Sequence, residues 1–433
     1  MKSASEWREI LAEVNQAGGC AHPIRLQGNR LDRVDGELVD TGIVVPCKDR
    51  RAAVCPSCSR LYQADAWQLV AAGIRGGKGV SPDVARHPQL FVTLTAPSFG
   101  PVHSRSRSGT TDRPCRPRRS GGSCPHGVPI SCTARHAEGD PLLGEPICAD
   151  CFDYRGAVLW NAHVPALWER TSSELYRAVG KAGGLTTKEV RARVRLSYMK
   201  VVEFQRRGLV HLHVVIRADG RDGPAEDAPS WLSLGVLIDA VNEAVAGATV
   251  AVPAVGGSPL SRASWGAERD VRVLVPRREG DSTAIAAYVA KYATKTADGT
   301  AWLAHPIRSK AQLERIVLRP HIARLVRQAW TLGQHKELRS IRLQPHAHTL
   351  GYTGQFSSKS LLFSTTFGAL RQARVQHVKG VREVGPDYDG EWRYAGRGYA
   401  HPESHQVAES LLEATYGVPH NCHTTSTTSS TTP

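Results

Sequence analysis

Hydrophobic positions alternate with polar ones in some parts of the chain and recur at helical spacing in others. LFVTLTAP (90–97) is rich in β-branched residues and predicts a strand, and SYMKVVEFQRRGLVHLHVVIRA (197–218) predicts two strands around a turn at Gly208. DVRVLVP (270–276) predicts a further strand. Apolar residues at helical spacing predict helices over residues 157–179, 232–248 and 281–299.

This order of elements indicates an α+β fold, with an antiparallel sheet covered by helices on one side. The first residues, MKSASEWREILAEVNQ, predict an amphipathic helix without the apolar core of a signal peptide, so we expect a cytoplasmic protein. The most apolar long window (232–257) contains Asp239 and Glu243, and we therefore expect no membrane partner.

The chain is strongly basic. Its 55 Lys and Arg residues outnumber 40 Asp and Glu residues over 433 positions, giving a formal net charge of +15. Such an excess is typical of proteins that bind nucleic acid, so DNA is the expected partner. The most basic run, SRSRSGTTDRPCRPRRSGG (104–122), lies in a loop-rich segment, where a solvated flexible loop is an equal alternative to DNA contact.

The chain has 10 cysteines, which in a reducing compartment favour metal binding over disulfides. CPSC (55–58) and CADC (148–151) are two C-x-x-C motifs, a spacing that lets both thiolates reach one Zn²⁺. Two structural zinc sites are predicted, with the ligands Cys20, Cys47, Cys55 and Cys58, and Cys124, Cys132, Cys148 and Cys151. Residues that could replace one of these ligands are His22, Cys115, His126 and His136. Some cysteines can instead be inert thiols, and for Cys422 this is the preferred interpretation.

Two histidines stand two residues apart in the apolar run GLVHLHVVIRADG (208–220). On a strand, His211 and His213 would project from the same face. Glu203 would join them if the turn had an odd number of residues or a bulge, which Gly208 could provide with a positive φ. Two imidazoles and a carboxylate could hold Mg²⁺ or Mn²⁺ against a phosphate oxygen. The alternatives are partly buried structural histidines and a surface carboxylate that pairs with a neighbouring arginine.

A second candidate lies in YVAKYATK (288–295). On a helix, Tyr288 and Tyr292 would be one turn apart, and Lys291 and Lys295 would lie one turn apart on an adjoining face. A tyrosine attacks phosphate only when a nearby cation favours the phenolate. The alternative is the edge of an ordinary amphipathic helix.

FVTLTAP, the E-x7-H-L-H spacing and YVAKYATK, in that order, resemble the three motifs of HUH endonucleases, and specifically rolling-circle replication initiators. Over residues 20–400 the chain looks like the replication initiators of actinobacterial plasmids and integrative elements. Further stretches that carry this resemblance are CPSCSRLY, HPQLFVTLTAPSFGPVH, CADCFDY and LGYTGQFSSKS.

The resemblance implies an HUH endonuclease-like antiparallel sheet with flanking helices. It implies that His211 and His213 are metal ligands with Glu203 as the third, and that Thr93 and Thr95 support this face of the sheet. By the same resemblance Tyr292 is a nucleophile and Tyr288 a second nucleophile or a positioning residue. The one-tyrosine relatives carry a carboxylate at the Tyr288 position, so termination by the second tyrosine is expected.

The resemblance also implies a metal-dependent nicking reaction at a replication origin in single-stranded or hairpin DNA. Lys291 and Lys295 would favour the phenolate and stabilise the transition state. A 5′-phosphotyrosine and a free 3′-OH would result, with a host polymerase extending the 3′-OH and a host helicase unwinding the duplex.

The expected domains are an N-terminal zinc-binding module (1–80), a nuclease domain (85–300) with a zinc-knuckle insertion at about 98–155, a basic region (301–400) and a mostly disordered tail (401–433). In the basic region, KAQLERIVLRPHIARLVRQAW (310–330) is either a DNA-contacting helix or one packed by its apolar stripe.

Two other functions fit the same motifs. One is a two-tyrosine HUH transposase, which shares the zinc module and the chemistry. The other is a non-enzymatic zinc-containing DNA-binding regulator, which would not form a covalent adduct with DNA.

Overall fold

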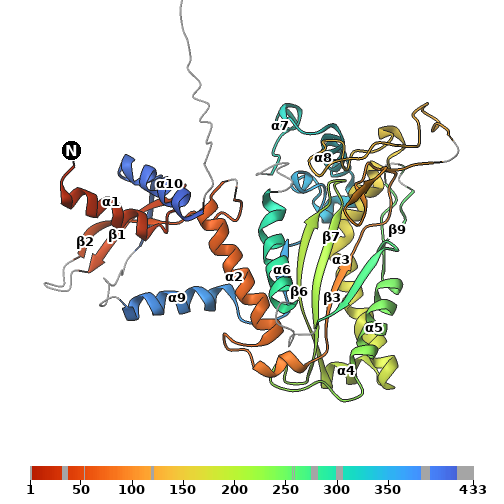
Figure 1. Cartoon of the computed structure of the whole chain (residues 1–433), viewed down its shortest axis with the longest axis horizontal. Helices are drawn as coiled ribbons and strands as arrows, with labels where there is room; N and C mark the ends of the chain where they lie inside the picture. The colour runs from red at the N-terminus through yellow and green to blue at the C-terminus, as the bar shows by residue number, and fades with distance from the viewer. Residues whose placement is uncertain are drawn as a thin grey trace, which may run out of the picture. The chain divides into compact units, whose positions relative to one another are not determined.

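In the computed structural model of the chain, two compact units are present, one formed by residues 1–65 with 371–433 and the other by residues 66–370. The structure describes residues 2–31, 38–52, 54–118, 121–255, 257, 259–274, 281–298, 306–381 and 391–416. Figure 1 shows the chain with its elements labelled. The division differs from the expected boundaries, because C-terminal residues return to complete the N-terminal module.

The first unit is a small sheet with helices. Its elements are α1 (Ala4–Gln16), β1 (Ile24–Leu31), β2 (Leu38–Val45), the start of α2 (Pro56–Arg75), most of α9 (Phe367–Val381), β12 (Arg393–Arg397) and α10 (Pro402–Tyr416). The strand order is β12-β1-β2, and α1 packs on α10. The tail expected to be disordered from residue 401 is therefore helical over α10, while 417–433 lie outside the described residues.

The second unit is built on a five-stranded sheet with the order β10-β3-β7-β6-β11. Its strands are β3 (Gln89–Leu94), β6 (Val194–Phe204), β7 (Val210–Gly220), β10 (Arg269–Val273) and β11 (Ser357–Lys359). All its pairings are antiparallel. The expected strands thus form one sheet within an α+β unit, and the two-histidine segment lies on the central strand β7.

Helices lie on both faces of this sheet, not on one as expected, and Figure 1 shows α6 (Asp281–Asp298) on one side of β6 and α3 (Tyr154–Gly183) and α5 (Leu234–Gly247) on the other. The face toward α3 is apolar, with Val92, Leu212 and Val214 fully buried in the core. The other face also carries fully buried apolar residues, Val201 and Val215 among them, and these require cover of their own.

Shorter elements complete the second unit. They are η1 (Pro82–Arg86), β4 (Ser106–Ser108), β5 (Thr111–Arg113), η2 (Ala149–Cys151), α4 (Thr187–Arg193), β8 (Thr249–Ala251), β9 (Arg262–Ser264), α7 (Lys310–Arg315), α8 (Pro320–Leu332), η3 (Lys336–Ile341) and η4 (Ala347–Thr349). In the described residues no helix is long and apolar enough to cross a membrane.

The segment 310–330 is not one helix. Pro320 begins α8, and the preceding residues form the short α7. In α8 the side chains of Ile322, Leu325 and Val326 are buried, so the apolar-stripe alternative describes this helix.

The turn between β6 and β7 sets which residues share a face. Gln205 and Leu209 are joined by a backbone hydrogen bond of 2.9 Å, leaving an odd-length loop with Gly208 at φ 78°. A Cβ at Gly208 would also lie 2.3 Å from Leu325 Cδ1, so both the φ and the packing require glycine. With this turn Glu203 pairs directly with His211.

Two buried polar side chains hold the same turn. Asn161 of α3 donates to the carbonyl oxygens of Gly208 (2.9 Å) and Leu350 (3.1 Å) and accepts from Val210 N–H (3.1 Å). His321 of α8 donates from Nε2 to the Arg207 carbonyl oxygen at 2.9 Å and accepts from the Tyr154 hydroxyl at 3.1 Å. Burial lowers the pKa of His321 from 6.5 to about 4.

This lowered pKa predicts a pH-dependent stability. Between pH 6.5 and pH 4, His321 is protonated in the unfolded chain but stays neutral in the folded chain. The free energy of unfolding therefore decreases as the pH falls from 6.5 toward 4. The loss is on the order of 3 kcal/mol at pH 4. In urea unfolding, the free energy of His321→Gln should fall less steeply than that of the wild type over this range. Parallel pH profiles for the two proteins would contradict the assignment.

Candidate metal centre and tyrosine site

Glu203, His211 and His213 come together on the α6 side of the sheet, with one ligand atom of each residue within 4.8 Å of the others. The alternation of β7 places both histidines on one face, and the pairing of Glu203 with His211 adds the carboxylate from β6. The His211 and His213 rings are stacked with centroids 4.7 Å apart. These three residues are called the metal triad below.

The surroundings of His211 favour the neutral imidazole, which is the form that binds a metal. Burial, with the nearby charges of His213 and Arg207, lowers its pKa to about 3, so the imidazole is neutral at physiological pH. Its Nδ1 lies 3.1 Å from Gln205 Nε2. Its Nε2 is buried and has no hydrogen-bond partner among the described residues. A metal ion would satisfy that nitrogen in the tautomer with the proton on Nδ1, which requires the Gln205 amide to turn its oxygen toward Nδ1–H.

His213 is almost fully buried, at 3% exposure, and its two nitrogens meet different partners. Nδ1 lies 3.2 Å from Thr93 Oγ1, and Nε2 lies 3.3 Å from Glu203 Oε2. When Thr93 accepts from Nδ1–H, the Nε2 lone pair faces the carboxylate, which is the tautomer that a metal ligand needs. The two nitrogens and one oxygen of the triad leave coordination positions for water or a phosphate oxygen.

Tyr288 of α6 lies against the metal triad. Its hydroxyl is 3.4 Å from His213 Nε2, and its ring packs edge-on against His213 and Phe91 with centroids 5.1 and 5.7 Å apart. The side chain remains 37% exposed. The phenol oxygen is therefore beside the ligand atoms, on a residue that is partly exposed to solvent.

The structure describes the other residues predicted from sequence to different extents. Lys291 is exposed on α6, one residue beyond the buried Ala290. Tyr292 and Lys295 belong to the same helix, but their side chains lie outside the described residues. Thr95 does not contact the histidines, because its hydroxyl donates to the Glu268 carbonyl oxygen.

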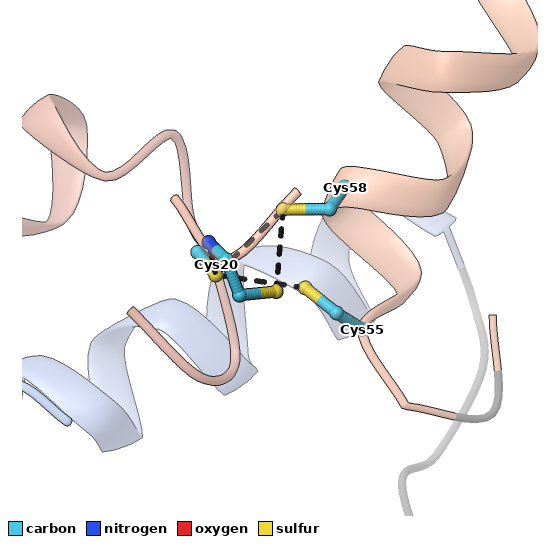
Figure 2. Close-up of side chains that lie close together, drawn as sticks. Cys20, Cys55 and Cys58 are labelled. Atoms are coloured by element: carbon cyan, nitrogen blue, oxygen red, sulfur yellow. Dashed lines mark hydrogen bonds between the residues drawn. The ribbon is translucent and has the colours of Figure 1, made fainter. Parts of the chain in front are cut away.

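The first cysteine cluster has the predicted composition, Cys20, Cys47, Cys55 and Cys58. The Sγ atom of Cys20 lies 3.7 Å from the Sγ atom of Cys55 and 3.7 Å from that of Cys58. Figure 2 shows these three side chains pointing toward one another. A tetrahedral zinc with bonds of about 2.3 Å separates its thiolates by roughly 3.8 Å. Hydrogen bonds from Cys20 and Cys58 lower the pKa of Cys55 far below its usual range. This cluster could bind zinc.

The second cluster differs from the predicted one by one ligand. Cys124, Cys148 and Cys151 are joined by His126, whose Nδ1 lies 3.2 Å from Cys151 Sγ and 3.7 Å from Cys148 Sγ. The expected Cys132 belongs elsewhere. His126 takes its place because it follows Cys124 in a tight turn, in which Gly127 N–H donates to the Cys124 carbonyl oxygen.

A third cluster, unexpected from the sequence, consists of His103, Cys115, Cys132 and His136. His136 Nε2 lies 3.1 Å from His103 Nδ1 and 3.6 Å from Cys132 Sγ. The other nitrogen of His136 donates to Asp140 Oδ2 at 2.6 Å. A carboxylate on the far nitrogen fixes the tautomer that directs the lone pair of Nε2 at a metal, as in many zinc sites. The predicted two zinc sites thus become three candidate sites.

Comparison with known proteins places the chain in a family. Residues 6–413 match the family model described as "RepSA: Replication initiator protein, pSAM2". A replication initiator protein from Streptomyces ambofaciens is 37% identical over 441 residues, covering 95% of this chain and 90% of that protein. The chain belongs to this family of replication initiator proteins. No solved structure matches it.

Several residues of the initiator's site were not predicted from its sequence. Gln205 and Phe91 contact the metal-triad histidines or Tyr288, and only their two-residue spacing from Glu203 and Thr93 could have indicated the shared face. His103 is not part of either C-x-x-C motif, so the motif spacing did not indicate it as a ligand. His126 and His136 were considered only as replacement ligands, and the spacings C-x-H at 124–126 and C-x3-H at 132–136 could have indicated them.

The three clusters predict the zinc content of the initiator. Purified protein should contain three zinc ions per chain by plasma mass spectrometry, one for each Cys/His cluster. Cys115→Ser should remove one zinc and lower the melting temperature, because structural zinc contributes folding energy. Cys422→Ser, a change in the C-terminal tail, should keep all three. Two zinc ions in the wild type, with none lost in Cys115→Ser, would show that the third cluster is not a zinc site.

Proposed function

We propose that this replication initiator binds its plasmid or element origin as DNA and nicks and rejoins one strand there by tyrosine transesterification. The observation that carries the proposal is the position of the Tyr288 hydroxyl, 3.4 Å from the metal-triad nitrogen His213 Nε2. A nucleophile and a cation site on one scissile phosphate are what phosphoryl transfer to a tyrosine requires.

The donor set supports a divalent cation, Mg²⁺ or Mn²⁺, held by Glu203, His211 and His213. When bound, such a cation would polarise the scissile phosphate and neutralise the charge that develops on it. The fit rests on the buried, unpartnered Nε2 of the neutral His211. Thr93 and Gln205 orient the two imidazoles through their other nitrogens.

In the proposed step, the phenol oxygen of tyrosine forms a bond to the scissile phosphorus as the bond from phosphorus to the 3′ oxygen breaks. The phenol loses its proton, and the leaving 3′ oxygen takes one up. The products are a 5′-phosphotyrosine and a free 3′-OH that a host polymerase can extend. The number of phosphodiester-type bonds is unchanged, so the reverse reaction rejoins the strand without ATP.

The two tyrosines have distinct proposed roles. Tyr288 is at the metal triad and is the candidate for the attack described above. Tyr292 follows one turn later on α6 and is the candidate for the second transfer, which would end replication. Lys291 and Lys295 would lower the energy of the phenolate and of the transition state. A central strand carrying both histidines within an antiparallel sheet supports an HUH-like arrangement.

The proposal predicts a covalent protein–DNA adduct. Single-stranded oligonucleotides from the DNA around the gene, incubated with the initiator and Mn²⁺, should give an adduct that resists denaturing electrophoresis. EDTA should abolish it, and His211→Ala should reduce the adduct rate by about 100-fold or more, since one preorganised charge-stabilising group typically contributes that much. Tyr288→Phe should abolish the first adduct, because the Tyr288 phenol oxygen is the proposed nucleophile.

Two further variants interpret the result. Tyr292→Phe should still form an adduct but fail in the second transfer, and Tyr176→Phe, which removes a phenol on α3, should react as the wild type does. A two-tyrosine transposase would give the same adduct but would act on the ends of its own element. DNA binding without any adduct, on every candidate origin and with Mg²⁺ as well as Mn²⁺, would support the non-enzymatic regulator instead.

A further inference from the structure

A groove of about 760 Å³ opens beside the metal triad, between the β6–β7 turn and the zinc-binding insert. Thr95 and Gln205 line it. Strand alternation places Thr95 on the same face as Thr93, and Gln205 on the same face as Glu203. Gln205 also contacts His211 at 3.1 Å. The groove is thus a continuation of the face that carries the metal triad.

The groove is lined by more positive than negative charge. Its ionisable side chains, apart from His103, are those of Arg105, Arg116, Arg206, Arg207 and Glu268. Two of the arginines already bind other groups of the protein. Arg207 donates to the carbonyl oxygens of Ala96 and Pro97 at 3.2 and 3.3 Å, and Arg105 pairs with Asp112 at 2.9 Å. The other two are available to a ligand.

Arg116 and Arg206 stand on different walls. Arg116 follows the zinc-cluster residue Cys115 and exchanges two backbone hydrogen bonds with Cys132, of 2.8 and 3.0 Å. No hydrogen bond or ion pair joins its guanidinium to another residue in the part of the chain that the structure describes. Arg206 is exposed on the turn, and its guanidinium meets only the Asp140 carbonyl oxygen, at 3.4 Å, among those residues.

The two walls are fixed to each other. Arg319 donates to the carbonyl oxygens of Leu143 in the insert (3.1 Å) and Arg206 in the turn (2.8 Å). At Gly144, which has φ +86°, an added Cβ would lie 2.5 Å from the carbonyl carbon of Arg206. The third cysteine and histidine cluster orders the Arg116 wall through Cys115 and Cys132. The backbone positions of Arg116 and Arg206 on the two walls are therefore set by the fold.

We propose that this groove binds the sugar–phosphate backbone of single-stranded DNA next to the scissile phosphate, with Arg116 and Arg206 each pairing with a phosphate. The inference rests on the proposed nicking function, because the metal triad defines where the strand would be cut. Guanidinium groups on two walls suit a polyanion that runs between them. The volume is in the range of pockets that hold one small ligand, which is enough for a short stretch of one strand.

The test measures binding and not cleavage. Fluorescence anisotropy of a labelled single-stranded oligonucleotide, without added divalent metal, is recorded for the full-length initiator over a range of salt concentrations. Arg116→Ala and Arg206→Ala should each weaken binding about ten-fold. The double variant should flatten the slope of log K against log salt concentration by about 1.4, since each lost phosphate contact contributes about 0.7 for single strands.

Arg193→Ala is the matched control, because Arg193 is an exposed arginine at the end of α4, where β6 begins, and the groove lies where β6 ends. It should bind as the wild type does. Circular dichroism and zinc content identify any variant that fails to fold, and Arg116→Lys and Arg206→Lys, which keep the charge, should restore most of the salt slope.

The outcomes separate this inference from the proposed function. If wild type nicks DNA and the folded double variant binds and nicks as well as Arg193→Ala does, the groove assignment is wrong. If no protein forms an adduct but the double variant loses affinity and salt slope, the groove stands and the nicking function fails. An equal loss of affinity in Arg193→Ala and the groove variants would mean general charge attraction and would overturn the inference.

Discussion

The pairing of Glu203 with His211 across β6 and β7 is the constraint on which the site depends. A shift of one residue in this pairing would turn the carboxylate to the opposite face and separate it from both imidazoles. The turn that fixes the pairing needs Gly208 in a left-handed conformation and is held from outside by Asn161 and His321. Helices far apart in the sequence, α3 and α8, therefore secure the geometry of one hairpin.

The face of β7 that carries the histidines contains two kinds of buried polar group. At one end, Arg217 and Asp219 are fully buried and pair with each other, and the guanidinium also donates to backbone carbonyl oxygens. At the other end, His211 Nε2 has no partner among the described residues. Buried polar groups are normally satisfied, so this difference supports the proposed bound ion at the histidine end. The groove with Arg116 and Arg206 opens at that same end.

Much of the central sheet was predictable because its signals are local. Strand alternation gave the shared face of His211 and His213, and Gly208 indicated the turn that brings Glu203 to them. The helix carrying Tyr288 was also predicted, as was the composition of the first cysteine cluster, in which the C-x-x-C motif fixes two members by spacing alone. The family match confirms the part of the resemblance that named the replication initiators of plasmids and integrative elements.

What the sequence did not predict depends on contacts between distant segments. The return of β12 to pair with β1, and the packing of α10 on α1, follow from pairing across most of the chain's length, which no local pattern encodes. The exchange of Cys132 for His126 has the same origin, because the insert brings together ligands from several loops. The second helical cover is explained by buried apolar residues such as Val201 and Val215, which lie on the same face of the sheet as the site residues.

The central claim is that Glu203, His211 and His213 hold a divalent cation next to the Tyr288 hydroxyl. The most direct test is a crystal structure of the initiator soaked in Mn²⁺, with anomalous diffraction recorded at the manganese edge. The account predicts one manganese peak within bonding distance of His211 Nε2, His213 Nε2 and a Glu203 oxygen, on the side facing Tyr288. Full occupancy at other sites with no peak among these three residues would contradict it.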